Sequence, residues 1–174
     1  MAKFPVGPNE RDRLRVLHAS GIIASPAIPA LDTLCEAAAS HFGVKSAIVT
    51  LLDADQQIFR AKWGIDGEGT PRNIAFCNYT ILEDKVFVVS DANADDRFAT
   101  NPVVTGPPFI RFYAGAPLLF QQEIRLGALC LLHPEPRTFT LGDRAELLAM
   151  ADRAVVTIAN FWFELGLPDI DGQS

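Results

Sequence analysis

Apolar residues repeat at intervals of three and four along three parts of the chain. This spacing predicts amphipathic helices with one buried face over 10–24, 30–42 and 141–165. Prolines in "ASPAIPALD" separate the first two helices, because proline removes a backbone donor. Gly43 is expected to end the second helix. Thr140, with Asp143 three residues later, resembles a capping box at the start of the last helix.

Alternating or continuous apolar runs predict strands between these helices, over 44–53, 56–64, 85–91, 110–120 and 123–133. The turns "DADQ" and "QQ" join two pairs of them as hairpins, and 74–82 is expected to form a short helix. The last strand is the most continuously apolar, so it is expected to be central in the sheet. The order α-α-β-β-α-β-β-β-α indicates an α+β fold with a mainly antiparallel sheet.

The two faces of this sheet are expected to differ. Helices cluster at the two chain termini, so they can pack together on one face. The loops around 64–81 and 92–109 are left to cover the other face. A cavity between a sheet and its covering loops is a typical small-molecule site.

The stretch "NPVVTGPPFIRFYAGAPLLF" joins a proline-rich loop to one of the predicted strands. Strand alternation sets two faces apart: Arg111, Tyr113, Gly115 and Pro117 against Phe112, Ala114, Ala116 and Leu118. The second set is expected to face the helices and the first set the loops. The Arg111 guanidinium could bind a carboxylate or phosphate of a ligand, but the favoured interpretation is an ion pair with Asp91, Asp95 or Asp96. Gly115 would leave space for a ligand or for close backbone approach.

Other candidates lie in the loops beside this strand. Phe76, Tyr79 and Phe109 could line a pocket, although aromatic residues at such positions are more often ordinary core. The carboxylates of "SDANADDRF" are expected to cap local backbone and to pair Asp96 or Asp91 with Arg97. The candidate ligand-binding residues are therefore Phe76, Cys77, Tyr79, Asp91, Phe109, Arg111, Tyr113 and Gly115.

Composition places the chain among globular proteins and narrows its partners. Its 174 residues suit one domain, with 49% hydrophobic and 21% charged residues. A net charge of −6 argues against nucleic acid, and no apolar run approaches the roughly 20 residues needed to span a bilayer. The amino terminus lacks the apolar segment of a secretory signal, so we expect a cytoplasmic protein without a membrane partner.

The three cysteines are dispersed at Cys35, Cys77 and Cys130. Such spacing argues against a disulfide framework and against a structural zinc site, and buried structural thiols are the simpler interpretation. Cys77 is the least certain because a possible pocket lies nearby. The serines show no nucleophile-elbow motif, so neither a catalytic site nor a cofactor is expected.

Three blocks of sequence resemble a GAF domain of a bacterial subgroup found ahead of histidine-kinase or diguanylate-cyclase modules. They are "TPRNIAFCNYTI", "VVSDANADDRFATNPVVTGPPFIRFYAGAPL" and "RLGALCLLHPEPRTFT". The resemblance implies a central six-stranded antiparallel sheet, ligand-side loops, and terminal helices that often pair in a dimer. The domain is expected over 9–165, with tails over 1–8 and 166–174.

The activities known in that family are not matched by these residues. The cysteines of free methionine-(R)-sulfoxide reductases, the cysteine and histidine of bilin-binding members, and the Asn-Lys-Xaa-Asp-Glu motif of cyclic-nucleotide binders are missing. The resulting prediction is a non-catalytic sensory module that binds an unidentified small molecule and forms a homodimer through its terminal helices. Two alternatives stay open: a cysteine-dependent redox enzyme acting on a small oxidised metabolite through Cys77, and a purely structural dimerisation module with a self-filled pocket. The apolar "ANFWFEL" favours the dimer, although the first helix could also cover it.

Overall fold

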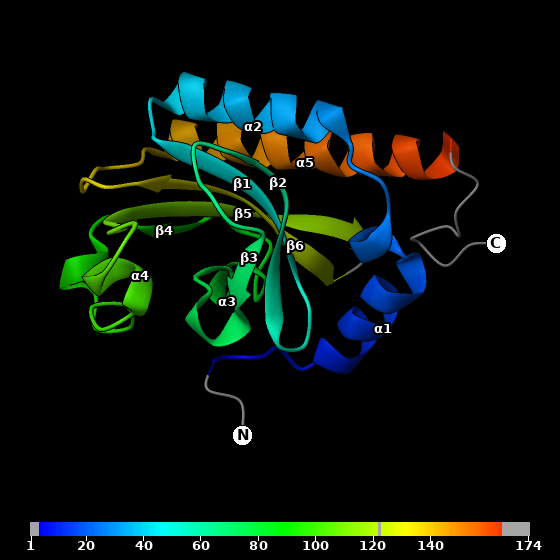
Figure 1. The fold of residues 1–174 in the computed structure, drawn as a ribbon, viewed down its shortest axis with the longest axis horizontal. Coiled ribbons are helices and arrows are strands. Elements are labelled where there is room, and N and C mark those ends of the chain that lie inside the picture. The colour runs from blue at the N-terminus through cyan, green and yellow to red at the C-terminus, as the bar shows by residue number, and fades with distance from the viewer. Residues whose placement is uncertain (1–3, 122, 165–174) are drawn as a thin grey trace.

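A six-stranded antiparallel sheet forms the centre of the computed structural model, which describes residues 4–121 and 123–164 (Figure 1). Its strands are β1 (Ser46–Leu52), β2 (Gln56–Trp63), β3 (Gly69–Pro71), β4 (Phe87–Val89), β5 (Phe112–Gln121) and β6 (Ile124–His133). They lie in the order β3-β2-β1-β6-β5-β4, and every neighbouring pair is antiparallel. The prediction that β6 is central is confirmed, because it lies between β1 and β5.

The short edge strand β3 lies where the residue pattern predicted only a loop. Its three residues carry no apolar alternation, and they form a strand because they pair with Gln56–Ile58 of β2. Gly69 permits this pairing, since a Cβ there would lie 2.2 Å from the Gln57 carbonyl oxygen. This strand completes the six that the family resemblance implied.

The helices agree with the periodicity in position but differ in detail. They are α1 (Glu10–Ser20), α2 (Pro29–Phe42), α3 (Cys77–Thr80), α4 (Pro102–Thr105) and α5 (Leu141–Glu164). The single helix predicted over 10–24 was wrong: Gly21 adopts a left-handed conformation with φ 74° and separates α1 from a 3₁₀ turn at Ile22–Ala24. The helix α4 was not predicted. The expected end of α5 at Leu165 lies outside the described residues.

Two predicted helix boundaries are confirmed by their capping geometry. Gly43 follows α2 in the left-handed conformation, with φ 65°. At the start of α5, the Thr140 backbone N–H donates to Asp143 Oδ2 at 2.9 Å, and the Asp143 backbone N–H donates to Thr140 Oγ1 at 3.0 Å. This reciprocal pair is the predicted capping box.

The two faces of the sheet bury separate apolar clusters. Helices α2 and α5 lie side by side over one face, and α3 and α4 lie on the other (Figure 1). The strand alternation in β5 is as predicted: Phe112, Ala114, Ala116 and Leu118 pack under α2 and α5, whereas Tyr113 points to the opposite cluster. None of the helices within residues 4–121 and 123–164 has both the length and the hydrophobicity that a membrane span requires.

Helix α1 lies at the end of the sheet that carries both hairpin turns (Figure 1). His18 lies 2.6 Å from Asp53, which follows β1, through Nε2 and Oδ1. The Asn9 side chain donates to the Glu123 carbonyl oxygen between β5 and β6. Leu17 enters the same buried cluster as α2 and α5. This helix therefore connects the helix-covered face with the hairpin ends.

A candidate ligand pocket between the sheet and its loops

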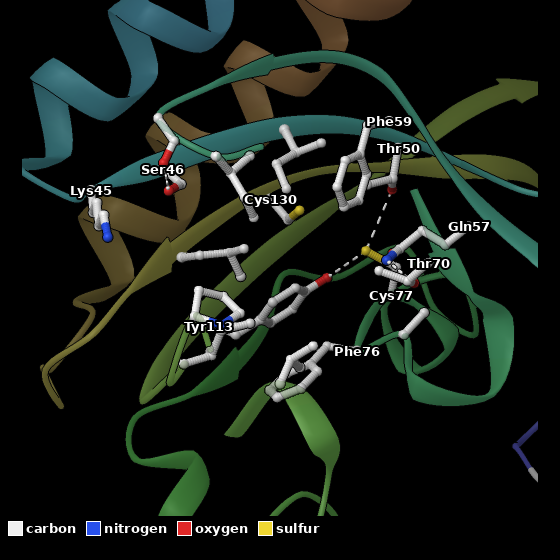
Figure 2. Close-up of a pocket in the computed structure, with 18 of the residues that line it drawn as sticks. Lys45, Ser46, Thr50, Gln57, Phe59, Thr70, Phe76, Cys77, Tyr113 and Cys130 are labelled. Atoms are coloured by element: carbon white, nitrogen blue, oxygen red, sulfur yellow. Dashed lines mark hydrogen bonds between the residues drawn. The ribbon is translucent and has the colours of Figure 1, made fainter. Parts of the chain in front are cut away.

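A cavity of about 480 Å³ lies on the sheet face opposite α2 and α5 (Figure 2). A volume of this size suits a small metabolite or cofactor fragment. Central strands β1 and β6 contribute Ile48, Cys130 and Leu132 to its lining. The proline-rich loop that carries α4 contributes Val103, Pro107 and Pro108. The loop therefore covers part of the sheet, as its sequence suggested.

Strand register explains why these side chains meet. Ile48 of β1 lies opposite Cys130 of β6, and Tyr113 of β5 lies opposite Leu132 of β6. Residues directly opposite each other in an antiparallel pair point to the same face of the sheet. Three adjacent strands thus present one continuous wall to the cavity.

Polar groups in the lining are few and occur at two ends of the cavity. Figure 2 shows Lys45 and Ser46 at one side, and Gln57 with Thr70 at the other. The Gln57 amide donates to Thr70 Oγ1 at 3.1 Å, which leaves its amide oxygen able to accept from a ligand. Phe59 and Phe76 form apolar walls between these ends. The arrangement suits a ligand with an apolar body and one or two polar groups.

His133 and Lys45 lie together at the mouth of the cavity. The Lys45 backbone N–H donates to His133 Nδ1 at 3.1 Å, so this nitrogen acts as an acceptor in the structure. The Lys45 side chain is exposed and positively charged, and the exposed carboxylate of Asp66 also lines the cavity. This part of the lining therefore offers one charge of each sign to a ligand.

A buried cluster of thiols and hydroxyls lies at the inner end of the cavity. Cys77 Sγ lies 3.1 Å from the Tyr113 hydroxyl, and Thr50 Oγ1 donates to the same sulfur at 3.4 Å (Figure 2). The Tyr113 hydroxyl is also 2.6 Å from Thr80 Oγ1. Cys130 lines the same cavity and belongs to the same buried apolar cluster as Cys77.

The thiols of this cluster differ in their tendency to ionise. Burial opposes ionisation of Cys77, but hydrogen bonds from Cys130, Thr50 and Tyr113 outweigh it and lower its pKa. The Cys77 hydrogen bond, together with burial, raises the pKa of Cys130. Burial likewise raises the pKa of Tyr113, which therefore stays a hydrogen-bond donor.

The structure brings three of the eight candidate residues to the cavity. Phe76, Cys77 and Tyr113 line it. Tyr79 instead stacks on Phe87, with ring centroids 5.4 Å apart, in an aromatic cluster beside the pocket. Gly115 makes room for a protein side chain, since a Cβ there would lie 2.2 Å from the Tyr113 hydroxyl.

The remaining three candidates have local roles around the proline-rich loop. Arg111 Nη1 donates to the carbonyl oxygens of Val104 and Ile110, at 2.9 and 3.0 Å. The predicted ion pair with a carboxylate is absent from the described residues, because backbone carbonyls lie nearer. Asp91 caps the 3₁₀ turn Ala92–Ala94 through the Asn93 N–H, at 3.0 Å. Phe109 is 47% exposed outside the cavity.

The loop arginine Arg97 pairs with a different aspartate from those predicted. Asp95 binds it through two hydrogen bonds, at 3.0 and 2.7 Å, rather than Asp91 or Asp96. Asp95 also accepts from the Arg97 backbone N–H, so the pairing is set by a two-residue turn. The expected helical turn near Phe98 is present as hydrogen bonds from the Phe98 and Ala99 N–H groups to the Asp95 carbonyl oxygen.

Several lining residues were not anticipated from the sequence. They are contributed mainly by the first hairpin: Lys45, Ser46, Ile48, Thr50, Gln57 and Phe59. Every residue of β1 is buried, so its sequence shows no alternation that would separate the two faces. The signal available was Thr50, a polar residue within the apolar run that follows Ser46 in β1.

Comparison with known proteins identifies the family. The family profile described as the GAF domain matches residues 16–158. The chain therefore belongs to the GAF domain family. A cyclic di-GMP phosphodiesterase of Pseudomonas aeruginosa is 42% identical over 137 residues. That match covers 79% of this chain but only 23% of the length of the relative.

Solved structures share the fold at low sequence identity. The GAF domain of a phosphoenolpyruvate-protein phosphotransferase from Coxiella burnetii has a TM-score of 0.66 at 15% identity, covering 90% of this chain and 98% of that one. The GAF domain of the corresponding Acinetobacter protein has a TM-score of 0.63 at 17% identity, covering 90% of this chain and 96% of that one. These neighbours support the GAF-like α+β architecture.

Proposed function

We propose that this chain is a non-catalytic sensory module of bacterial signal transduction that binds a small molecule in the cavity beside β1, β6 and α3. The observation that carries the proposal is the cavity itself: about 480 Å³, mainly apolar, with polar groups at its two ends. Pockets with this composition bind small ligands through apolar contact and orient them through a few hydrogen bonds.

The alternative of a self-filled structural module is less well supported. That alternative needs an aromatic side chain inside the cavity, and Phe76 or Phe109 was the candidate. Phe76 lies in the wall, stacked on Phe98 with ring centroids 4.0 Å apart. Phe109 points to solvent. The space between the walls is left for a ligand.

Homodimerisation through the terminal helices is the second part of the proposal. Helix α5 exposes Leu141, Val156 and Phe163, at 84%, 57% and 86%. Trp162, by contrast, is buried in the monomer, so part of the apolar "ANFWFEL" segment is already covered. The exposed residues provide an apolar surface that a second copy would bury.

Signal output would pass from the pocket to the terminal helices by a shift between two packing arrangements. The Pseudomonas aeruginosa relative, named as a cyclic di-GMP phosphodiesterase, supports a setting in bacterial signalling. A histidine kinase or a diguanylate cyclase is the proposed kind of partner. The three free cysteines suit the reducing cytoplasm, where we place the protein.

Native mass spectrometry of the purified protein tests both parts. We expect a mass of twice the chain plus a small-molecule excess that disappears on denaturation. The variant Ile65→Trp, which enlarges a lining residue at the pocket mouth, should lose the excess. Leu119→Trp, on an exposed site outside the pocket, should keep it. A monomer would contradict the dimer. An excess that both variants retain would place the ligand elsewhere.

A further inference from the structure

The hydroxyl groups at the two ends of the cavity use their own protons inside the protein. Ser46 Oγ donates to the Gly64 carbonyl oxygen at 2.7 Å, and Thr70 Oγ1 donates to the Pro71 carbonyl oxygen at 3.0 Å. A hydroxyl has one proton, so each of these oxygens can only accept a further hydrogen bond.

The hydroxyls at the inner end of the cavity are likewise bound within the protein. Thr50 Oγ1 lies 3.3 Å from the Ala128 carbonyl oxygen and 3.4 Å from Cys77 Sγ, and it accepts from the Ala128 backbone N–H at 3.2 Å. The Tyr113 hydroxyl lies 2.6 Å from Thr80 Oγ1 and 3.1 Å from Cys77 Sγ. Neither hydroxyl therefore has a spare proton to donate to a ligand.

Gln57 supplies an unpaired acceptor in this lining. The residue is only 8% exposed, and its amide nitrogen donates to Thr70 Oγ1 at 3.1 Å (Figure 2). Because the Thr70 proton goes to Pro71, Thr70 accepts from Gln57, which places the amide nitrogen and not the oxygen beside Thr70. Within residues 4–121 and 123–164, no donor binds Gln57 Oε1, and this oxygen is not enclosed by protein. It is open to a ligand in the cavity that Gln57 lines.

We propose that the pocket selects its ligand by hydrogen-bond polarity: it binds an aromatic molecule with an N–H or O–H donor, and Gln57 Oε1 accepts from that donor. This inference rests on the proposed function, since it names the ligand class of the same cavity. Phe59 and Phe76 provide the apolar walls on which an aromatic ring packs. A ligand that can only accept would leave Gln57 Oε1 buried without a partner, which weakens binding.

The mouth of the cavity does not share this polarity. Lys45 and Asp66 offer opposite charges there, and both are exposed. His133 accepts from the Lys45 backbone N–H through Nδ1, so Nε2 of the neutral ring carries the proton and is a donor. Gln57 Nε2 keeps a second hydrogen, so an acceptor beside the ligand's donor is compatible with the site. Selectivity for a donor therefore depends on Gln57 Oε1.

Matched pairs of compounds test the proposal by isothermal titration calorimetry on the dialysed protein. Indole and benzofuran have nearly the same shape, but indole has an N–H donor where benzofuran has an oxygen that can only accept. β-Naphthol and its methyl ether differ likewise in an O–H donor. We expect the donor of each pair to bind about tenfold more tightly, as one hydrogen bond to a buried acceptor implies. Equal affinities within both pairs, or tighter binding of the acceptor-only compounds, would overturn the proposal.

Two neighbouring glutamines provide the variant and its control. Gln57→Met removes the acceptor and keeps a side chain of similar length, so it should lower the affinity for indole to that for benzofuran. Gln56 is exposed on the opposite face of β2 and does not line the cavity, so Gln56→Met should keep the preference of the parent protein. A preference for indole that survives Gln57→Met would overturn the assignment to Gln57. The compound pairs on the parent protein decide the proposal even if Gln57→Met fails to fold.

The variant Ile65→Trp distinguishes failure of this inference from failure of the proposed function. Indole binding that Ile65→Trp abolishes, but without a preference over benzofuran, would overturn the donor selectivity and leave a pocket that binds small molecules. If none of the compounds binds while the native mass shows a small-molecule excess, the ligand class is wrong and the proposed function stands. No binding and no excess would overturn both.

Discussion

The guanidinium of Arg72, in the pocket-side segment before α3, binds the carboxylate of Glu10 at the start of α1. Arg13 binds the same carboxylate through Nε at 2.9 Å and Nη2 at 2.8 Å. Arg72 Nε also donates to Asn78 Oδ1 at 2.9 Å, within α3. One carboxylate therefore joins the first helix of the domain to the wall of the pocket.

Replacing this carboxylate should destabilise the fold strongly. The Arg13 and Arg72 side chains are only 2% and 1% exposed. Among the described residues, Glu10 is the only acidic side chain that forms an ion pair with either arginine. Within residues 4–121 and 123–164, Arg13 Nη1 and Arg72 Nη2 also have no hydrogen-bond partner. Glu10→Gln would leave two buried positive charges uncompensated, and we expect a loss of about 3 kcal/mol in the free energy of unfolding, measured with urea.

The matched control for Glu10→Gln is Asp12→Asn on the same helix. Asp12 pairs with Arg15 at 3.4 Å, and both side chains are exposed. Exposed pairs of this kind contribute about 0–1 kcal/mol, so this variant should be nearly neutral. Equal losses from the two variants would show that the Glu10 cluster does not stabilise the fold as described.

The Glu10 cluster also predicts how stability depends on pH. Burial opposes ionisation of Glu10, but hydrogen bonds and charge from Arg13 and Arg72 outweigh it and lower the pKa from 4.5 to about 2. Because the folded-state pKa lies below the unfolded value, the stabilisation is complete above pH 4.5 and is lost as the pH falls toward 2. This lowering of the Glu10 pKa corresponds to about 3 kcal/mol in the free energy of unfolding, at about 1.4 kcal/mol per pKa unit.

Urea titrations between pH 6 and pH 2 measure this dependence. Asp53, Asp95 and Asp143 also have lowered pKa values, so the parent protein loses stability from several groups in acid. Glu10→Gln should keep the acid-induced loss of stability that these aspartates cause. It should lack the further loss that protonation of Glu10 causes in the parent protein. Parallel curves for the two proteins over this range would contradict the assignment to Glu10.

Much of the fold could be predicted because burial imposes a period on the sequence. The helices α2 and α5 follow that period, and the hairpins β1–β2 and β5–β6 are marked by alternating or continuous apolar runs on either side of a polar turn. Strand β3 could not be found in this way, because Gly69, Thr70 and Pro71 form a strand only through their pairing with β2. The break at Gly21 was also missed, since the apolar spacing continues into the 3₁₀ turn.

The candidate site was predicted less well, for a related reason. Alternation in β5 located Tyr113 correctly on the cavity face, while Arg111 lies before the strand begins and bonds to the loop. In β1 both faces are buried, so Ile48 and Thr50 gave no sign of which face they occupy. That Cys77 and Cys130 line the same cavity depends on how α3 packs on β6, which no local pattern reveals.

Two glycines of the chain should respond to alanine in opposite ways. At Gly127 in β6, an added Cβ would lie 1.7 Å from the Thr50 carbonyl oxygen on the adjacent central strand. Gly127→Ala should therefore lower the free energy of unfolding by about 3 kcal/mol through forced separation of β1 and β6. Gly142 lies in the first turn of α5, where the nearest atom would be 3.7 Å away.

Gly142→Ala should consequently be neutral or stabilise the protein by up to about 1 kcal/mol, because alanine favours helix. Urea unfolding of both variants against the parent protein gives the comparison. Hydrogen exchange of the β1 and β6 amides should increase in Gly127→Ala and stay unchanged in Gly142→Ala. A Gly127→Ala variant as stable as the parent would mean that the two central strands can separate at little cost.

Gly115 determines where the Tyr113 hydroxyl lies, and so connects packing with the chemistry of the pocket. A Cβ at Gly115 would lie 2.2 Å from the Tyr113 hydroxyl and 2.8 Å from Thr80 Oγ1. Gly115→Ala should displace the tyrosine ring, break its hydrogen bonds to Thr80 and Cys77, and cost about 2–3 kcal/mol. Tyr113→Phe removes the same two hydrogen bonds without the clash, so it should cost less, about 1–2 kcal/mol. Urea unfolding of both variants against the parent protein measures these losses in the free energy of unfolding. A Gly115→Ala variant as stable as Tyr113→Phe would show that the tyrosine ring makes room for the added methyl group at no cost beyond its two hydrogen bonds.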